Sequence, residues 1–459
     1  LMNDTASIKR QFINSLKRGT GEAYLIVKDN PKIDFSNHII KGVLNIYAYD
    51  GQCETDRAKY IFDIISISKQ KDKIRKAILQ GLTTEQNDTW NLTHLFALAK
   101  LYAQQNDTEV KQAIYDRFLN NPIEGSDWVG AYEILELDGL NGLFYVAEKF
   151  GKYIEQNPDD WQDDWIIKRF QEENESIKIY EELKKKARTN KFIRIYLENI
   201  KRTKASQEKH KTKPTKYKDI IDEVLNSKPR FSFFRKRNLA DDEVNQIAMR
   251  LIDETDKSNI ECLLDIFDFY KFPYDSHIIL DFAKQKRTTK NRIVENAIDA
   301  LKHLKSKEIR TFALDKIQTA KNPIDYLEIL VSNYKNGDFK LLSEIANKTN
   351  NEHKIEHLAG IYTDIFKANK TKECKQPLEI LYDKMNCAIH RNGIVEILIE
   401  NNVLSDRIKN EIKYDCDLET RKLTKWQQKR QVTAVWQNGG FCAKFNGSSS
   451  IELLYKTEH

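Results

Sequence analysis

The sequence has little glycine and proline, with 16 Gly and 8 Pro among its 459 residues. Together with 40% hydrophobic and 31% charged residues, this scarcity disfavours a turn-rich β fold and suits long solvated helices. The longest apolar runs, such as Phe62 to Ile67, are far shorter than the roughly 20 residues that cross a bilayer. Residues 1–20 lack the apolar centre of a secretory signal peptide. We therefore expect a soluble, unexported, cytoplasmic protein with no membrane partner.

Motifs of known enzyme and metal sites are also scarce. The cysteines are dispersed and form no C-x-x-C pair, which argues against a zinc ribbon or a disulfide framework and fits a reducing compartment. They are Cys53, Cys262, Cys374, Cys387, Cys416 and Cys442. Gly19 and Gly21 form a G-x-G without the further Gly or the Lys-Ser/Thr of a phosphate loop. The sequence thus predicts no catalytic constellation and no cofactor.

The clearest pattern is a pair of amphipathic helices between Asn291 and Ile317. From Arg292 to Leu304, apolar residues recur at helical spacing along one stripe. Ser306 can then accept a hydrogen bond from the free amides that begin a second helix. Such a pair cannot bury its apolar faces alone, so it needs a similar pair on each side. Comparable patterns recur along the chain and predict an all-α fold of stacked antiparallel helix pairs.

Two segments resemble the second helix of a HEAT repeat. Residues 107–114 read Asp-Thr-Glu-Val-Lys-Gln-Ala-Ile, and residues 306–313 are similar with Ser at the first position. Each has a capping residue, then an aliphatic residue and a base three and four positions on. Residues 54–58 and 418–421 are looser echoes. The resemblance extends over most of residues 1–425 and implies a HEAT/armadillo-type α-solenoid, in which the acid and the base bond neighbouring repeats together.

The distribution of charge suggests how the chain is organised. Residues 124–175 contain 14 acidic and four basic side chains, a net charge of −10, whereas residues 184–237 contain 19 basic and five acidic side chains, a net charge of +14. Residues 202–218 lack helical periodicity, so we expect a flexible linker there. The predicted domains are an N-terminal helical array (1–183), a basic linker or helical segment (184–237), a C-terminal helical array (238–425) and a tail (426–459). The tail is either a small β cap or disordered.

The end of the basic stretch is a candidate nucleic-acid site. It interleaves cations, which neutralise phosphates, with aromatic rings, which stack on bases. The candidate residues are Lys228, Arg230, Phe231, Phe233, Phe234, Arg235, Lys236 and Arg237. The alternative is that the basic stretch pairs with the acidic block just upstream, which would leave little field for a nucleic acid.

A loop near the N-terminus is a candidate partner-binding surface. It combines Tyr47, Tyr49, Asp50 and Arg57 in a dense polar and aromatic cluster, and loops held by rigid scaffolds often carry recognition sites. In the alternative interpretation, Asp50 or Glu54 caps the following helix and Arg57 bonds a neighbouring repeat. Residues 414–421, which read Tyr-Asp-Cys-Asp-Leu-Glu-Thr-Arg, leave the same two interpretations open.

Residues 353–357 match H-x-x-E-H, the inverted zinc-protease motif. In that motif two His side chains one helical turn apart bind zinc and the Glu serves as the base, so His353 and His357 are candidate ligands and Glu356 the candidate base. The motif also needs a downstream acidic ligand on an α+β fold, whereas this region is predicted to be another helix of the array. A solvated helix face is the alternative.

Three functions follow from these observations. The HEAT resemblance implies a non-enzymatic scaffold that binds a protein partner on the solenoid surface, and it predicts an exposed patch rich in Tyr, Phe or Leu on the inner helices. The second is a nucleic-acid-binding solenoid that uses residues 184–237. The third is a zinc hydrolase at residues 353–357. No residue pattern for the base-modifying chemistry of some HEAT-like enzymes is found.

Overall fold

The computed structural model describes residues 2–51, 54, 57–123, 125–126, 128–160, 162–209, 216–227 and 238–424. Within these ranges the regular structure is entirely helical, which confirms the predicted all-α class. The predicted tail, residues 426–459, and the nucleic-acid candidates Lys228 to Arg237 lie outside the described residues.

The first arc of the molecule, residues 2–209, consists of helices α1 to α11. They are α1 (Met2–Arg18), α2 (Glu22–Asp29), α3 (Ser36–Leu44), α4 (Arg57–Ile67), α5 (Lys71–Thr84), α6 (Thr89–Ala103), α7 (Thr108–Leu119), α8 (Ala131–Gln156), α9 (Trp165–Glu173), α10 (Ile179–Ala187) and α11 (Lys191–Lys209). Helix α8 is kinked at Gly139, whose φ of 55° is non-helical. Helix α11 continues to Lys209, so the predicted flexible linker is wrong for residues 202–209, which are helical.

The second arc consists of residues 220–414 and begins after α11. Its α-helices are α12 (Ile220–Asn226), α14 (Asp241–Asp253), α15 (Lys257–Ile266), α16 (Ser276–Ala283), α17 (Ile293–Ala300), α18 (Lys307–Thr319), α19 (Leu330–Asn333), α20 (Phe339–Lys348), α21 (Glu352–Ala368), α22 (Lys375–Lys384), α23 (Ala388–Glu400) and α24 (Asp406–Glu411). Short 3-10 helices complete it: η1 (Leu301–His303), η2 (Pro323–Ile329), η3 (Lys372–Cys374) and η4 (Ile412–Tyr414). The boundaries agree closely with the apolar stripes in the sequence.

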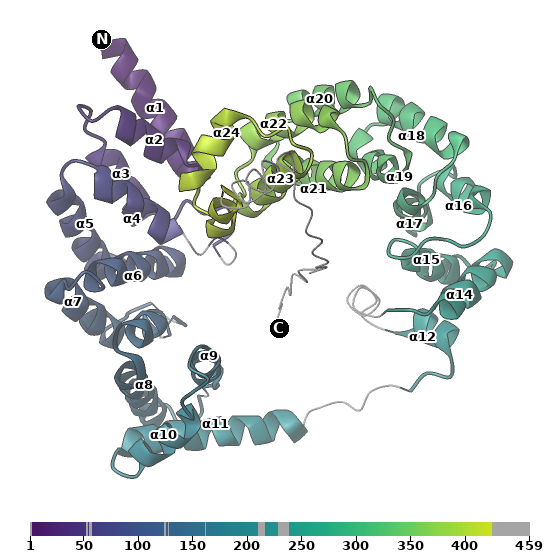
Figure 1. Cartoon of the computed structure of the whole chain (residues 1–459). Coiled ribbons are helices and arrows are strands. Elements are labelled where there is room, and N and C mark those ends of the chain that lie inside the picture. Colours follow the sequence, from purple (N-terminus) through teal and green to yellow (C-terminus); the bar gives the residue numbers. More distant parts are fainter. Residues whose placement is uncertain are drawn as a thin grey trace, which may run out of the picture.

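The helices form two rows, because many of them pack on the next helix but one as well as on the next. In the first arc α3 contacts α5 and α5 contacts α7, while α4 contacts α6 and α6 contacts α8. In the second arc α19, α21 and α23 form one row and α20 and α22 the other. Figure 1 shows α4, α6, α17, α19, α21 and α23 on the side that faces the centre of the molecule.

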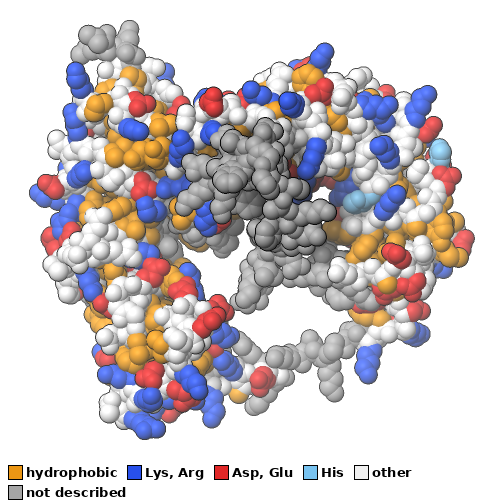
Figure 2. Space-filling model, viewed as in Figure 1, with side chains coloured by type: hydrophobic (Ala, Val, Ile, Leu, Met, Phe, Trp, Pro, Cys, Tyr) orange, Lys and Arg blue, Asp and Glu red, His pale blue; other side chains and the backbone are white. Residues whose placement is uncertain are grey.

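The two arcs together surround a central opening. Figure 1 shows α1 to α4 beside α22 to α24, so that helices from the two ends of the sequence meet. On the opposite side of the opening, α11, the last helix of the first arc, and α12, the first helix of the second arc, lie apart from each other. The opening persists when side chains are drawn in full, and Lys, Arg, Asp and Glu are interspersed over the visible face (Figure 2).

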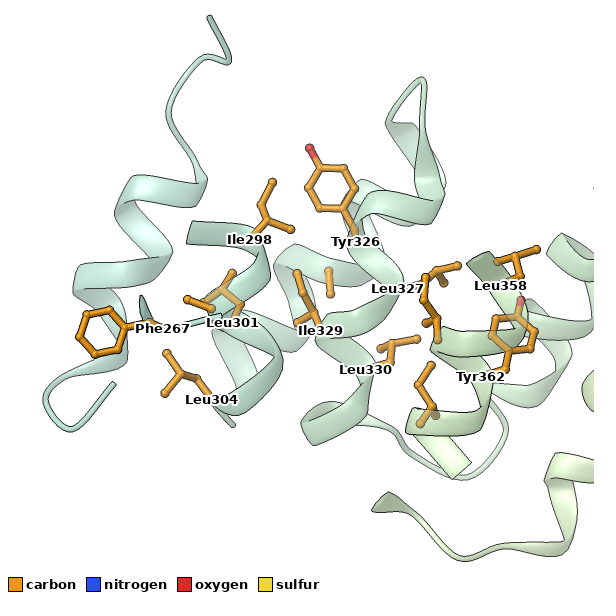
Figure 3. Packing of buried hydrophobic residues seen from close by; sticks show 14 of the residues in the cluster. Phe267, Ile298, Leu301, Leu304, Tyr326, Leu327, Ile329, Leu330, Leu358 and Tyr362 are labelled. Carbon is orange, nitrogen blue, oxygen red and sulfur yellow. The ribbon is translucent and has the colours of Figure 1, made fainter. Parts of the chain in front are cut away.

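Each arc has its own hydrophobic core. One core contains buried residues from Phe12 to Ile200, and the other contains buried residues from Ile220 to Ile412. Figure 3 shows how side chains from successive elements of the second core, such as Leu301, Leu330 and Leu358, follow one another along the arc. Ala388 of the second arc and Cys416, which follows η4, belong to the first core, which places the junction of the two arcs at these residues.

The predicted helix caps are present. Ser306 Oγ accepts from the Ile309 N–H at 3.1 Å, and Asp107 Oδ1 accepts from the Val110 N–H at 3.2 Å. The bases four positions after these caps also bond to acids further along the chain, Asp138 within α8 and Asp338 just before α20. Lys111 donates to Asp138 at 2.6 Å, and Arg310 makes two hydrogen bonds with Asp338, at 2.7 and 2.8 Å.

Candidate functional site

The junction between the two ends of the ring is held by main-chain and side-chain contacts. The Cys416 N–H donates to the Gly19 carbonyl at 2.8 Å. The Arg18 guanidinium donates to the carbonyl of Tyr382 at 2.6 Å, at the end of α22. The rings of Tyr24 and Tyr414 stack with their centroids 4.0 Å apart. We call this junction the closure.

Two buried ion pairs lie within the closure. Arg57 and Glu54 pair at 2.7 Å with side chains 3% and 2% exposed, and Arg391 and Asp415 pair at 3.1 Å with both side chains fully buried. Arg57 also donates to the carbonyls of residues 16–18, which end α1. Removing one member of such a pair would leave the other charge buried without a partner. The sequence patterns at 54–58 and 414–421 therefore meet in one network.

The loop predicted to bind a partner faces this junction. Arg57 is buried, so its guanidinium cannot meet a partner, and its contacts are to Glu54 and α1 rather than to a neighbouring repeat. Tyr49 is half-buried and bonds to α21, and Tyr47 lies under the Lys17 ammonium group, 5.7 Å from it. Asp50 is exposed. The Oε1 atom of Glu54 accepts from the Ala388 N–H of α23 at 2.8 Å, and its Oε2 atom pairs with Arg57.

A polar cluster lies where Tyr49 reaches the second arc. The Tyr49 hydroxyl donates to Glu356 Oε2 at 2.9 Å and lies 3.0 Å from His353 Nδ1. The other oxygen of this carboxylate, Glu356 Oε1, is 3.4 Å from His390 Nδ1. The same ring nitrogen is 3.2 Å from Cys387 Sγ. Side chains of α21 and of the start of α23 thus converge beside the N-terminal loop.

Burial sets the protonation of this cluster. It raises the pKa of Tyr49 to about 12, with a further contribution from the hydrogen bond to Glu356. It lowers the pKa of His390 and raises that of the Cys387 thiol. At neutral pH the phenol, the imidazole and the thiol are therefore uncharged.

The structure does not bring the H-x-x-E-H residues together as a zinc site. His353 bonds to Tyr49, whereas His357 Nε2 is 4.0 Å from Glu328 Oε1 and faces a different neighbour. Among the described residues, one group of His, Cys, Asp and Glu has the spacing of metal ligands, and it comprises Glu356, Cys387 and His390. Of the three motif residues, Glu356 belongs to this group, whereas His353 and His357 do not.

Sequence reasoning did not select Cys387 and His390. The signal was present, because the two residues stand three apart at the start of a predicted helix and form a C-x-x-H pattern. Because it is not a C-x-x-C pair, the spacing of the cysteines alone does not reveal it. The third member, Glu356, lies on another helix, so no local spacing could have joined it to the other two.

A second candidate site is a groove along α10 and α11, at the end of the first arc. Its volume is about 660 Å³. Aliphatic groups of Ala187, Leu197, Ile200 and Ala205 contribute to its lining, together with the ring of Tyr180. The other lining residues are charged: Lys184, Arg194, Glu198, Lys201, Lys204 and Glu208.

The described part of the basic stretch is partly neutralised by the acidic block. Lys204 pairs with Asp164 and Lys191 pairs with Glu155, both at 2.5 Å. Arg202 donates to the carbonyl of Pro158 at 2.8 Å. These contacts lie within the first arc, so part of the +14 charge is balanced locally and the field available to a nucleic acid is reduced.

The apolar patch predicted on the inner helices is not found on α17 to α23. The exposed large apolar residues of the described chain are scattered over other elements: Ile67, Trp90, Leu119, Trp128, Tyr153, Met249, Ile252 and Tyr274. Charges of both signs meet between elements of the second arc, where Lys302 of η1 pairs with Asp268 and lies 3.4 Å from Glu328 of η2.

Comparison with other proteins gives no family assignment. A scan against protein-family models finds no match, and a search of curated protein sequences finds no similar protein. In the described part of the chain, no helix combines the length and the apolar character needed to cross a membrane.

Proposed function

We propose that the protein is a macromolecule-binding α-solenoid scaffold of HEAT type, and that the groove on α10 and α11 binds an acidic amphipathic helix of a protein partner. The solenoid assignment is supported by the two rows of helices and by the bonds from Lys111 to Asp138 and from Arg310 to Asp338, which link successive helical pairs.

The composition of the groove carries the partner proposal. An amphipathic helix binds in a groove by placing its apolar side chains on an aliphatic floor, while its charged face meets opposite charges at the rim. Leu197, Ile200 and Ala187 supply such a floor, and Lys184 and Lys201 belong to a mainly basic rim. Helix α11 ends the first arc, so this face is not covered by a further helical pair of that arc.

The groove suits an acidic helix better than a nucleic acid. Single-stranded nucleic acids bind through aromatic faces as well as cations. Among the described residues that line this groove there is one aromatic side chain, Tyr180, whose hydroxyl bonds to Asp164 at 2.8 Å. Lys204, one of the rim cations, is also paired with Asp164. The nucleic-acid alternative depends on residues 228–237 and stays a prediction.

The experiment measures binding of a fluorescent 20-residue helical peptide, with Leu and Ala on one face and Glu on the other, by anisotropy. The matched variants are Lys184→Glu and Lys185→Glu. Both lysines lie on α10 and pair with a Glu three residues earlier, with exposed fractions of 62% and 65%, but Lys184 lines the groove and Lys185 does not. We expect Lys184→Glu to weaken binding about tenfold, the effect of losing roughly 1.4 kcal/mol, and Lys185→Glu to change it little.

The same titration with single-stranded and duplex DNA and RNA tests the alternative. Binding that falls steeply with salt and is lost when Arg230, Arg235, Lys236 and Arg237 are changed to Glu would favour the nucleic-acid function, because counterion release has this signature.

Equal loss of peptide binding in the two lysine variants would contradict the groove proposal.

A further inference from the structure

The side chains of Glu356, Cys387 and His390 have an arrangement that the scaffold function does not use. Glu356 Oε1 lies 3.4 Å and Cys387 Sγ lies 3.2 Å from His390 Nδ1, and all three potential ligand atoms lie within 4.8 Å of one another. Tetrahedral zinc bonds of about 2.0 to 2.3 Å place neighbouring ligand atoms about 3.3 to 3.8 Å apart. We propose that these three side chains bind one zinc ion at the closure.

The same geometry argues against a cysteine hydrolase triad. In a triad the nucleophile and the acid contact different nitrogens of the imidazole, so that a proton can pass across the ring. Here the thiol and the carboxylate both approach Nδ1 of His390. Convergence of sulfur, nitrogen and oxygen atoms on one point is the arrangement that a borderline-soft divalent ion requires.

The surroundings suit a structural metal. Cys387 is the residue that precedes the first turn of α23, and the helix N-terminus stabilises a thiolate there. On binding, the Cys387 thiol releases its proton to solvent and its sulfur bonds to the metal. The thiolate and the Glu356 carboxylate then balance the charge of Zn²⁺, and the His390 imidazole binds as a neutral ligand.

Tyr49 would orient one of the ligands. Its hydroxyl donates to Glu356 Oε2, the oxygen that does not face His390. Hydrogen bonds of this kind to the far atom of a ligand fix its orientation, and their loss typically costs roughly 10- to 100-fold in metal affinity. A cavity of about 10 Å³, about the smallest volume that admits one water molecule, borders Tyr49, Glu356 and Cys387, and a water there would supply the fourth ligand.

The site would connect the two ends of the ring. Glu356 belongs to α21, and Cys387 and His390 belong to the start of α23, while Tyr49 comes from the first arc. Metal binding would therefore rigidify the surface that receives Tyr49, and through Tyr49 it would strengthen the closure.

The experiment uses the full chain, stripped of metal with a chelator and titrated with Co²⁺, whose bond to a thiolate gives a charge-transfer absorption band. We expect one equivalent of Co²⁺ to produce this band and Zn²⁺ to displace it. Cys387→Ala should abolish the band, His390→Gln should weaken Co²⁺ binding at least tenfold, and Tyr49→Phe should weaken it roughly 10- to 100-fold.

The controls are Cys374→Ala and His357→Gln. Cys374 is another buried cysteine, and His357 is an exposed histidine on α21; neither change should alter the band. Circular dichroism checks that each variant is folded, and His390→Gln, at a half-buried position, carries the test if Cys387→Ala does not fold. Absence of the band in the wild-type protein, or its persistence in a folded His390→Gln variant at unchanged affinity, would overturn the proposal.

Discussion

The Glu54 carboxylate accepts a hydrogen bond from the Ala388 N–H at 2.8 Å, so a side chain of the first arc caps a helix of the second. A helix N-terminus has free N–H groups and a partial positive charge, both of which a carboxylate satisfies. The other oxygen of Glu54 pairs with Arg57 at 2.7 Å. One side chain thus serves a buried ion pair and a helix cap at the closure.

Replacing Glu54 with Ala is expected to destabilise the protein strongly. The change leaves the buried Arg57 guanidinium without its counter-charge, a loss of about 3 to 5 kcal/mol when one member of a buried pair is removed. Urea unfolding measures the change. The control is Glu109→Ala, whose exposed carboxylate pairs with Arg75 and should contribute less than about 1 kcal/mol. Similar losses for the two variants would contradict the role given to Glu54.

Replacing Gly21 with Ala should loosen the closure. A Cβ atom at this position would lie 1.8 Å from the Glu411 carbonyl oxygen, a contact that requires the backbones to separate. Gly21 has a helical φ of −63°, so the effect is steric and not a matter of backbone conformation. Hydrogen exchange of α24 amides should become faster, whereas amides of α18 should change little.

The matched control for this substitution is Gly360→Ala in α21. A Cβ atom at Gly360 meets nothing within 4 Å, so the helix should gain about 0.5 to 1 kcal/mol from the better helix former. If Gly21→Ala lowers the free energy of unfolding and Gly360→Ala raises it, Gly21 is needed for the approach of the two arcs. Stabilisation by both changes would contradict it.

Asp299 should make stability fall as pH rises. Burial, together with the carboxylates of Asp268 and Glu328, raises its pKa to about 7 in the folded protein, although Lys302 and Arg292 oppose the shift. The folded state then keeps a proton that the unfolded chain loses near pH 4, so stability declines between about pH 4 and pH 7. Asp299→Asn should remove the contribution of Asp299 to this decline and raise the free energy of unfolding at pH 8 by about 2 kcal/mol, allowing for partial solvent screening.

Unfolding in urea at several pH values checks this expectation. Glu411, whose pKa burial also raises to about 7, contributes in the same direction, so Asp299→Asn should flatten the wild-type profile without removing its slope. Asp281→Asn on α16, where the side chain is 74% exposed, serves as the control and should leave the profile unchanged. If the free energy of unfolding of Asp299→Asn changed with pH in parallel with that of the wild type, Asp299 would not be the group that causes the decline.

The pair Arg310–Asp338 should couple neighbouring helical pairs more strongly than a surface pair does. Its two hydrogen bonds, 2.7 and 2.8 Å, join side chains that are 15% and 11% exposed. A double-mutant cycle with Arg310→Ala and Asp338→Ala should give a coupling of about 1 to 3 kcal/mol. The exposed pair Lys348–Glu344 should give no more than about 0.5 kcal/mol in the same measurement.

Local chemistry predicted the elements of this fold well. The stripe from Arg292 to Leu304 corresponds to α17 and η1, and Ser306 caps α18 as expected. Such features depend on residues within one or two helical turns, which a single sequence displays directly. The helical end of the basic stretch was missed because residues 202–209 are polar and lack an apolar stripe, although they continue α11.

The closure could not be predicted in the same way. The dense polar segments at Tyr47 to Arg57 and at Tyr414 to Arg421 were both noticeable in the sequence, but nothing local shows that they face one another. Glu54 illustrates the difficulty, because its position suggests a cap for the next helix, while its actual partner is Ala388. Cys387 and His390 likewise acquire a shared neighbour, Glu356, only when α21 and α23 pack together.

The contact between Gly19 and Cys416 has a consequence for kinetics. Most helix contacts join elements that are close in sequence, and such contacts form quickly, whereas joining two distant ends requires closing a long loop. We therefore expect the ring to close late in folding, after the transition state for forming the arcs. Interactions made that late slow unfolding and leave the folding rate almost unchanged. The helical pairs then determine how fast the ring forms, and its first and last helices determine how long it lasts.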